Sequence, residues 1–310
     1  MPVSFFAMVM GLAGLTIAWE KAESVLALPA VIHLPMLALT VATFVTLAIA
    51  YTVKFTRYRP AVVAEWRHPV KLSFFPATSI SLLLLSIALM GVSAAVAQTL
   101  WSLGALLHLG LTLFVLNSWL HHDHYETHHI NPAWFIPAVG NVIVPVAGVE
   151  LGHTEISWFF FSIGMLFWLV LMVIVFYRMM FHAPLPDRLM PTLFILIAPP
   201  AVGFIAYLKL SGEVDAFARV LYFSALFLTL MMLTQARRFL ALSFYLSWWA
   251  YSFPLAAISI ASLSLAEKTG TVAFATIGAG LLVLLSLVVL VLLTQTLRHV
   301  HQRRICVPEG

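Results

Sequence analysis

Charged residues are scarce in this sequence. Only 9% of its 310 residues are Asp, Glu, Lys or Arg, whereas 62% are hydrophobic. A soluble domain carries roughly 25% charged residues, and a water-facing surface cannot be built from so few. Apolar runs of the ~20 residues needed to cross a bilayer recur along the whole chain. The sequence therefore predicts an integral membrane protein.

Cysteine is almost absent, and its absence excludes two kinds of site. The single Cys306 permits neither an intramolecular disulfide nor a cysteine metal site. No Lys or Arg precedes the first apolar run, so we expect residues 3–19 to be a retained span rather than a signal peptide. The net charge of +4 comes from basic residues scattered over loops, which indicates membrane orientation and no nucleic-acid partner.

The hydrophobic runs predict an all-α membrane domain of ten transmembrane helices. The runs are far longer than the strands of a membrane barrel. We expect this single domain to cover residues 1–298 and a short cytoplasmic tail to cover 299–310. The expected spans are 3–19, 31–56, 71–90, 94–119, 132–149, 157–178, 190–210, 215–235, 245–265 and 273–297.

The basic residues predict the orientation of these spans. With the N-terminus inside, twelve of the 16 Lys and Arg residues fall on the cytoplasmic side. Only Lys21, Lys209, Arg219 and Lys268 fall on the other side. This bias satisfies the positive-inside rule. We therefore expect both termini in the cytoplasm and a bacterial-type inner, or plasma, membrane.

Prolines inside alternate spans form an internal repeat. Pro76, Pro137, Pro199 and Pro254 lie in the third, fifth, seventh and ninth spans, at steps of 61, 62 and 55 residues. A proline removes a backbone hydrogen bond and bends a helix. Interrupted helices in corresponding positions of repeats point to a transport site. We expect the odd spans to surround a central path; the alternative is that the prolines only improve packing.

At these positions the chain resembles the tellurite-resistance and C4-dicarboxylate transporter family, which includes the slow anion channels of plant guard cells. The resemblance covers nearly the full chain, in the same order and with the same number of spans. It is carried by Met10–Leu15 with Ala18-Trp19, Arg67–Pro69, Phe74–Pro76, Asn131–Val139, Leu196–Pro200 and Trp248–Pro254.

The resemblance implies a fold, an assembly and a gate. The fold would be five helical hairpins in a quasi-fivefold arrangement, with the odd helices around a pore, and the assembly a homotrimer. Phe253 matches a phenylalanine that plugs the pore. Where the family often has a proline in the first helix, this chain has Val9, so that helix would kink less, or through Gly11 and Gly14.

The expected path carries almost no charge, so its anion contacts would be neutral. Half-helix N-termini and hydroxyl groups would hold an anion loosely, which suits conduction. The candidates for weak anion contact are Ser79, Asn141, Ser252 and Ser259. Hydroxyls elsewhere show that such groups also serve helix packing. His108 lies in an even span, where we expect a packed, hydrogen-bonded histidine.

Two aromatic residues precede prolines and are candidates for the pore wall. A phenylalanine ring in a narrow apolar constriction blocks ions sterically and by dewetting. Phe253 precedes Pro254 and is the expected gate, whereas Phe75 occupies the equivalent position before Pro76. The alternative for both phenylalanines is that they only pack against neighbouring helices.

The histidine-rich run 121–129 suggests a metal site, but a second histidine box is missing. We expect a solvated cytoplasmic loop, with adventitious metal binding or pH sensing as alternatives. The sequence thus predicts no enzyme, no catalytic residue, no cofactor and no resident metal. The expected function is passage of small anions such as chloride or nitrate. The alternative is a secondary carrier for tellurite, sulfite or C4-dicarboxylates.

Overall fold

The described part of the chain is built from helices. The computed structural model describes residues 1–121 and 125–302, and no strand occurs in these ranges. Nine helices within them are long and apolar enough to cross a membrane. A shorter apolar segment, Pro132–Gly148, lies between the fourth and the fifth of these helices. The predicted all-α, multi-pass fold is confirmed, and the count of ten spans stays a prediction.

Five helical segments alternate along the chain with five long helices, and we call them the inner segments. Each begins with a short 3-10 helix that gives way to an α-helix. They are η1 (Val3–Phe5) with α1 (Phe6–Val25); η2 (Lys71–Phe74) with α4 (Ala77–Leu89); η4 (Pro132–Trp134), α6 (Phe135–Val139), η5 (Gly140–Ile143) and α7 (Val144–Gly148); η6 (Met190–Ile197) with α9 (Ala198–Ser211); and η7 (Leu246–Tyr251) with α12 (Ser252–Thr269).

The helices between them are the outer helices: α2 (His33–Arg57), α5 (Ala94–His121), α8 (Thr154–Phe181), α10 (Ala216–Thr234) and α13 (Val272–His301). Short helices α3 (Arg59–Trp66), η3 (Thr127–His129) and α11 (Ala236–Leu240) complete the described chain.

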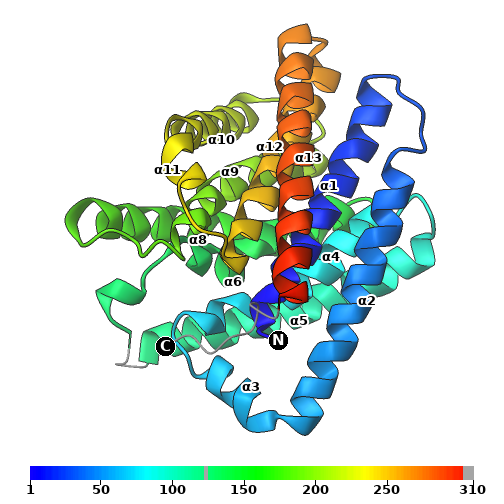
Figure 1. Cartoon of the computed structure of the whole chain (residues 1–310). Coiled ribbons are helices and arrows are strands. Elements are labelled where there is room, and N and C mark those ends of the chain that lie inside the picture. The colour runs from blue at the N-terminus through cyan, green and yellow to red at the C-terminus, as the bar shows by residue number, and fades with distance from the viewer. Residues whose placement is uncertain (122–124, 303–310) are drawn as a thin grey trace.

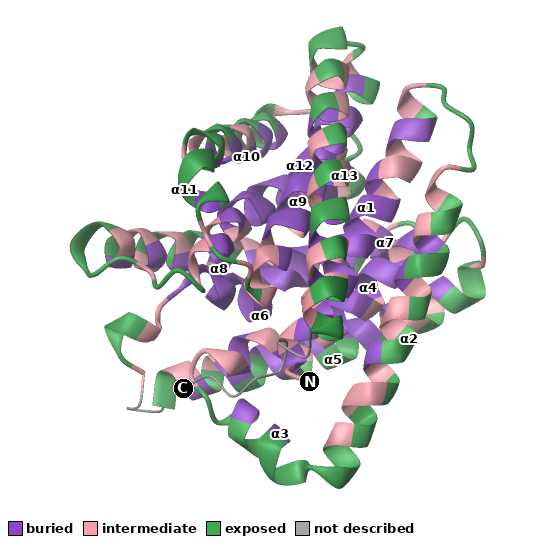
Figure 2. Cartoon of the chain, in the orientation of Figure 1, coloured by how far each residue is buried: buried purple, intermediate pink, exposed green. Residues whose placement is uncertain are grey.

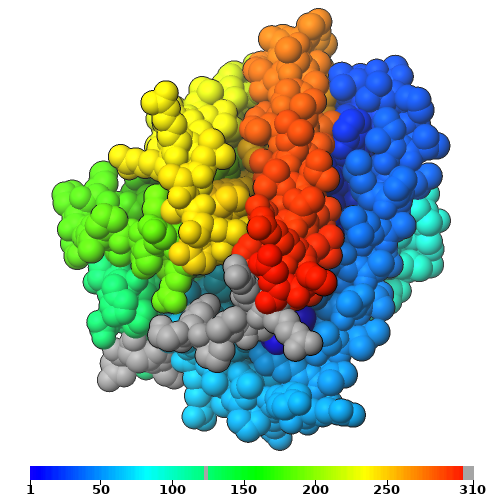
Figure 3. Space-filling model, viewed as in Figure 1, coloured from blue at the N-terminus to red at the C-terminus, as the bar shows by residue number. Residues whose placement is uncertain are grey.

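Burial separates the two sets. In the four inner segments long enough to span a membrane, 67 to 83% of the apolar window is buried, against 17 to 39% in the outer helices. The fifth, Pro132–Gly148, is buried throughout except at Val146. Figure 2 shows the buried residues gathered on α1, α4, α6, α9 and α12, and Figure 3 shows α13 running over the outer surface. The outer helices therefore offer their apolar faces to lipid.

Contacts between the inner segments close into a ring. Helix α1 contacts α4, which contacts η5 and α7; these contact α9, which contacts α12, which returns to α1. Each inner segment also packs against the outer helix that follows it in the chain. The start of α1 and the end of α13 lie at the same end of the molecule (Figure 1).

The four repeated prolines lie where 3-10 helix gives way to α-helix. Pro76 is the N-cap of α4, and Pro137, Pro199 and Pro254 lie within the first three residues of α6, α9 and α12. A proline is tolerated in the first turn because its missing N–H has no intrahelical partner there. The inner segments therefore change helix type near the prolines.

Two glycines show how closely α1 and α12 pack. A Cβ atom on Gly11 would overlap the Ser252 side chain and lie 3.0 Å from Cε3 of Trp249. One on Gly14 would lie 2.8 Å from the Ala256 Cβ atom. Small residues let membrane helices approach in this way. Helix α1 runs unbroken through both glycines.

Charged side chains pair near the ends of the inner segments. At one end, Lys21 Nζ lies 2.6 Å from Glu267 Oε2, and Lys209 pairs with Glu150. At the end where the chain starts, Lys54 Nζ lies 2.8 Å from Glu65 Oε1. Burying a charge in hydrocarbon is costly, so charges collect at the two faces. The middle of the ring is left apolar.

Candidate permeation cavity

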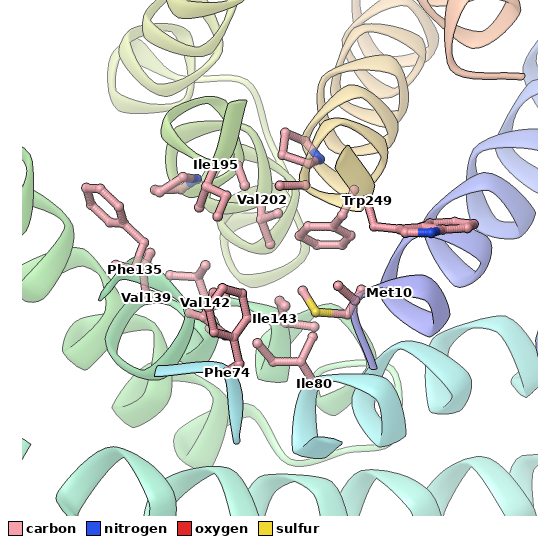
Figure 4. A pocket seen from close by; sticks show the side chains of 18 residues that line it. Met10, Phe74, Ile80, Phe135, Val139, Val142, Ile143, Ile195, Val202 and Trp249 are labelled. Carbon is pink, nitrogen blue, oxygen red and sulfur yellow. The ribbon is translucent and has the colours of Figure 1, made fainter. Parts of the chain in front are cut away.

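A cavity of about 70 Å³ lies at the centre of the ring, and every inner segment contributes to its wall. Its lining includes Met10 of α1, Ile80 of α4, Ile143 of η5, Val202 of α9 and Phe253 of α12. In Figure 4 the labelled side chains converge on one space from several segments. A water molecule needs roughly 10–15 Å³, so the cavity has room for a few waters or a small ion.

The lining residues are all apolar. The one polar side-chain atom among them, Nε1 of Trp249, donates a hydrogen bond to Thr296 Oγ1 at 3.0 Å. Helix N-termini from four inner segments begin around this space, so their partial positive charge is the available attraction for an anion. Such a cavity binds an ion weakly and opposes its entry by dewetting.

Phe253 lies in the cavity wall on the first turn of α12, with Pro254 beside it. Its Cδ2 atom is 3.4 Å from the position of a Cβ on Gly14, so the ring packs against a stretch of α1 that carries no side chain. Phe253 is partly buried, unlike most of α12. The ring therefore keeps part of its surface exposed beside the cavity.

Only some of the other residues expected in the pore wall line the cavity. Pro199 lines it, whereas Pro76, Pro137 and Gly11 lie outside the lining set. Phe75 packs edge-on against Tyr51 and Trp66, with ring centroids 6.4 and 4.6 Å away.

Its neighbour Phe74 lines the cavity in its place. Phe75 and Phe253 therefore do not occupy equivalent places in the structure. Pro76 is the N-cap of α4, whereas Pro254 is the third residue of α12, so the two phenylalanines lie at different positions relative to the start of their helices.

The four candidate anion contacts are buried and bonded within the protein. Ser79 Oγ donates to Pro76 O at 2.8 Å, Ser252 Oγ to Trp249 O at 2.6 Å, and Ser259 Oγ to Gly278 O at 2.9 Å. Asn141 Nδ2 donates to Ala138 O at 2.8 Å and to Thr112 Oγ1 at 3.1 Å. None of the four is among the lining residues of the described cavity.

The histidine-rich run is only partly visible. His122 and His124 lie outside the described residues. In the described part, Nδ1 of His128 lies 3.2 Å from Oε2 of the exposed Glu126. Across residues 1–121 and 125–302, no group of three or more His, Cys, Asp or Glu side chains is arranged to hold a metal.

His108 on α5 is fully buried, with Nδ1 2.9 Å from Ser79 Oγ. It packs and bonds between helices as expected. It also lies against Gly140, a cavity-lining residue, which the sequence did not indicate.

A comparison with protein families gives one match. The SLAC1 family model, described as a voltage-dependent anion channel, matches residues 1–297. The match includes all five inner segments and nearly all of α13.

Individual relatives agree with this match. The S-type anion channel SLAH3 of Arabidopsis thaliana is 30% identical over 305 residues, covering 96% of this chain and 48% of that protein. The guard cell S-type anion channel SLAC1 of the same plant is 25% identical, covering 96% and 55%.

The tellurite resistance protein TehA homolog of Haemophilus influenzae is 24% identical, covering 93% and 90%. The chain thus spans about half the length of the two plant relatives and nearly all of the bacterial one.

Proposed function

The chain belongs to the SLAC1 family of voltage-dependent anion channels, and from this premise we propose that it conducts small anions through the cavity between its inner segments. The observation that carries the proposal is the cavity itself, because all five inner segments line it and its wall is apolar. The family is one of channels, in agreement with the prediction that the chain is not an enzyme.

We propose that the chain crosses the membrane ten times as five helix pairs with quasi-fivefold symmetry. The closed ring of inner contacts and the pairing of each inner segment with its following helix support this arrangement. Pro132–Gly148 would be the tenth crossing: it has fewer residues than the others, but its 3-10 turns rise about 2.0 Å per residue against about 1.5 Å in an α-helix, which offsets part of the difference. An even number of crossings agrees with the start of α1 and the end of α13 lying at one end of the molecule (Figure 1).

Phe253 is the proposed gate of this path. Its ring lies in the wall of a cavity that holds a few waters at most, and it packs against Gly14 of α1. An apolar ring in such a constriction raises the barrier to a hydrated ion by excluding both the ion and its water. The same residue is indicated by the family resemblance.

The permeant ions we propose are monovalent anions such as chloride or nitrate. A cavity without a fixed cation gives an ion no strong site in which to rest, which suits conduction more than tight substrate binding. We further propose a homotrimer in a bacterial-type inner membrane with both termini in the cytoplasm. The resemblance supports the trimer, and the distribution of Lys and Arg supports the orientation.

A secondary carrier is the second candidate, because a tellurite resistance protein homolog is among the relatives. Reconstitution of the purified full chain into planar bilayers under a chloride gradient separates the two. We expect a current that reverses at the chloride equilibrium potential and grows without saturation as chloride rises. A flux that saturates, and that only tellurite, sulfite or a dicarboxylate supports, would contradict the channel and favour the carrier.

A further inference from the structure

One carboxylate at an end of the ring of inner segments has no partner. The side chain of Glu20 on α1 makes no ion pair or hydrogen bond in the part of the chain that the structure describes. The charges with which it interacts belong to two bonded pairs. Glu23 Oε2 lies 2.6 Å from His33 Nδ1, and Lys209 pairs with Glu150. Glu20 is therefore left as an uncompensated negative charge.

The carboxylate of Glu20 faces the inside of the ring. In the ring, α1 lies between α4 and α12, whereas Glu150 follows α7 and Lys209 lies on α9, both farther round. A side chain on α1 that interacts with both of these charges points across the ring and not toward lipid. Oε1 of Glu20 lies 3.8 Å from the position of a Cβ on Gly91, just beyond the end of α4, so no side chain of that residue covers the carboxylate.

This end of the ring is an entrance to the cavity, and we call it the outer mouth. Glu20 lies ten residues after the cavity-lining Met10, which is about 15 Å along α1 at 1.5 Å per residue. Glu20 is partly exposed, so solvent reaches its carboxylate. An anion that arrives from this side meets the negative charge before it reaches the apolar wall.

We propose that Glu20 is a specificity-determining residue that favours monovalent over divalent anions at the outer mouth. The proposal rests on the proposed anion-channel function. A fixed negative charge lowers the local concentration of anions, and the Coulomb energy is proportional to the charge of the ion. A divalent anion such as sulfate is therefore opposed twice as strongly as chloride. The lining of the described cavity carries no charged side chain that could make this distinction.

Replacing Glu20 by glutamine removes the charge and keeps the shape of the side chain. A unit charge about 7 Å from an ion in water changes the energy of that ion by about RT, so we expect chloride entry to rise about threefold and sulfate entry about ninefold. The gain should be present at about 10 mM salt and lost at about 1 M, because the Debye length falls from about 30 Å to about 3 Å. Glu20→Asp keeps the charge and should show little of either gain.

Glu155→Gln is the matched control. Glu155 is exposed in the first turn of the outer helix α8, which starts four residues after Glu150. The change removes one carboxylate from the same face of the protein, but from an outer helix instead of the mouth. We expect it to change the entry of both anions far less than Glu20→Gln does.

Tracer uptake of chloride and of sulfate into vesicles that contain the purified full chain tests the inference. The parent protein carries Phe253→Ala, and each further change is made in this parent. We expect Glu20→Gln to raise the sulfate-to-chloride uptake ratio about threefold at about 10 mM salt. At about 1 M salt the ratio should return to that of the parent.

An equal rise for both anions, a ratio that stays raised at high salt, or the same rise in Glu155→Gln would overturn the proposal while leaving the channel intact. Sulfate uptake by Glu20→Gln at the level of protein-free vesicles would overturn it as well. Absence of chloride uptake in every variant and in the parent would instead count against the proposed function.

Discussion

Replacing Phe253 by alanine is expected to raise the anion current at least about tenfold. The ring lies in the wall of a cavity of about 70 Å³, where a benzyl group excludes both an ion and its water. Truncation opens this constriction, and a fall of ~1.4 kcal/mol in the barrier is a tenfold gain in rate. Single-channel or macroscopic current per reconstituted protein measures the effect.

Phe75→Ala is the matched control for Phe253→Ala. Both changes remove a phenylalanine that directly precedes a proline, but Phe75 packs against Tyr51 and Trp66 and does not line the cavity. We expect the current of Phe75→Ala to stay near that of the wild type. Equal currents in wild type and Phe253→Ala, with both proteins folded, would refute the gate.

Gly11→Ala should destabilise the protein by about 1–3 kcal/mol, the usual cost of overpacking a tight core. The added methyl group would overlap the side chain of Ser252 and press on Trp249. Helices α1 and α12 would have to separate. Because Ser252 precedes Phe253, this separation should also change the resting current. Thermal unfolding of the purified protein in detergent reports the loss of stability.

Gly110→Ala supplies the comparison, because a Cβ at this position on α5 meets nothing within 4 Å. There we expect no loss, or a gain of up to about 1 kcal/mol from better helix propensity. A Gly11→Ala protein as stable as Gly110→Ala would show that α1 and α12 do not pack as closely as the structure has them.

The long helices could be predicted from sequence because lipid imposes a simple pattern. A run of about 20 apolar residues has few alternatives to a helix when no water is present to satisfy the backbone. The expected span 190–210 is thus observed at Met190–Ser211, and 273–297 at Val272–His301. The short helix α3 (Arg59–Trp66) was not predicted, because its eight residues include Arg59 and Glu65 and form no long apolar run.

The details of the cavity were less accessible to sequence reasoning. Proline positions marked the inner segments, but they could not reveal that each segment begins as 3-10 helix. A 3-10 turn holds three residues per turn instead of 3.6, so the facing residue shifts along the chain. This shift places Phe74 in the cavity wall and Phe75 against Trp66.

The contact between His108 and Gly140 could not be predicted from the sequence. It joins residues of an outer helix and an inner segment through the absence of a side chain, and no local pattern records it. The hydroxyls that looked suited to an anion are instead bonded to backbone carbonyls. In a membrane interior the backbone bond is the more common use of a serine, which is why such residues are weak indicators of a site.

The central claim is that anions pass through the cavity between the inner segments. Cysteine modification at Val202, a lining residue of α9, tests it most directly in a Cys306→Ser, Phe253→Ala background. A charged thiol reagent should block most of the current of Val202→Cys. The same reagent should leave Leu230→Cys, on the exposed face of α10, conducting. Full modification of Val202→Cys with an undiminished current would place the path elsewhere in the protein.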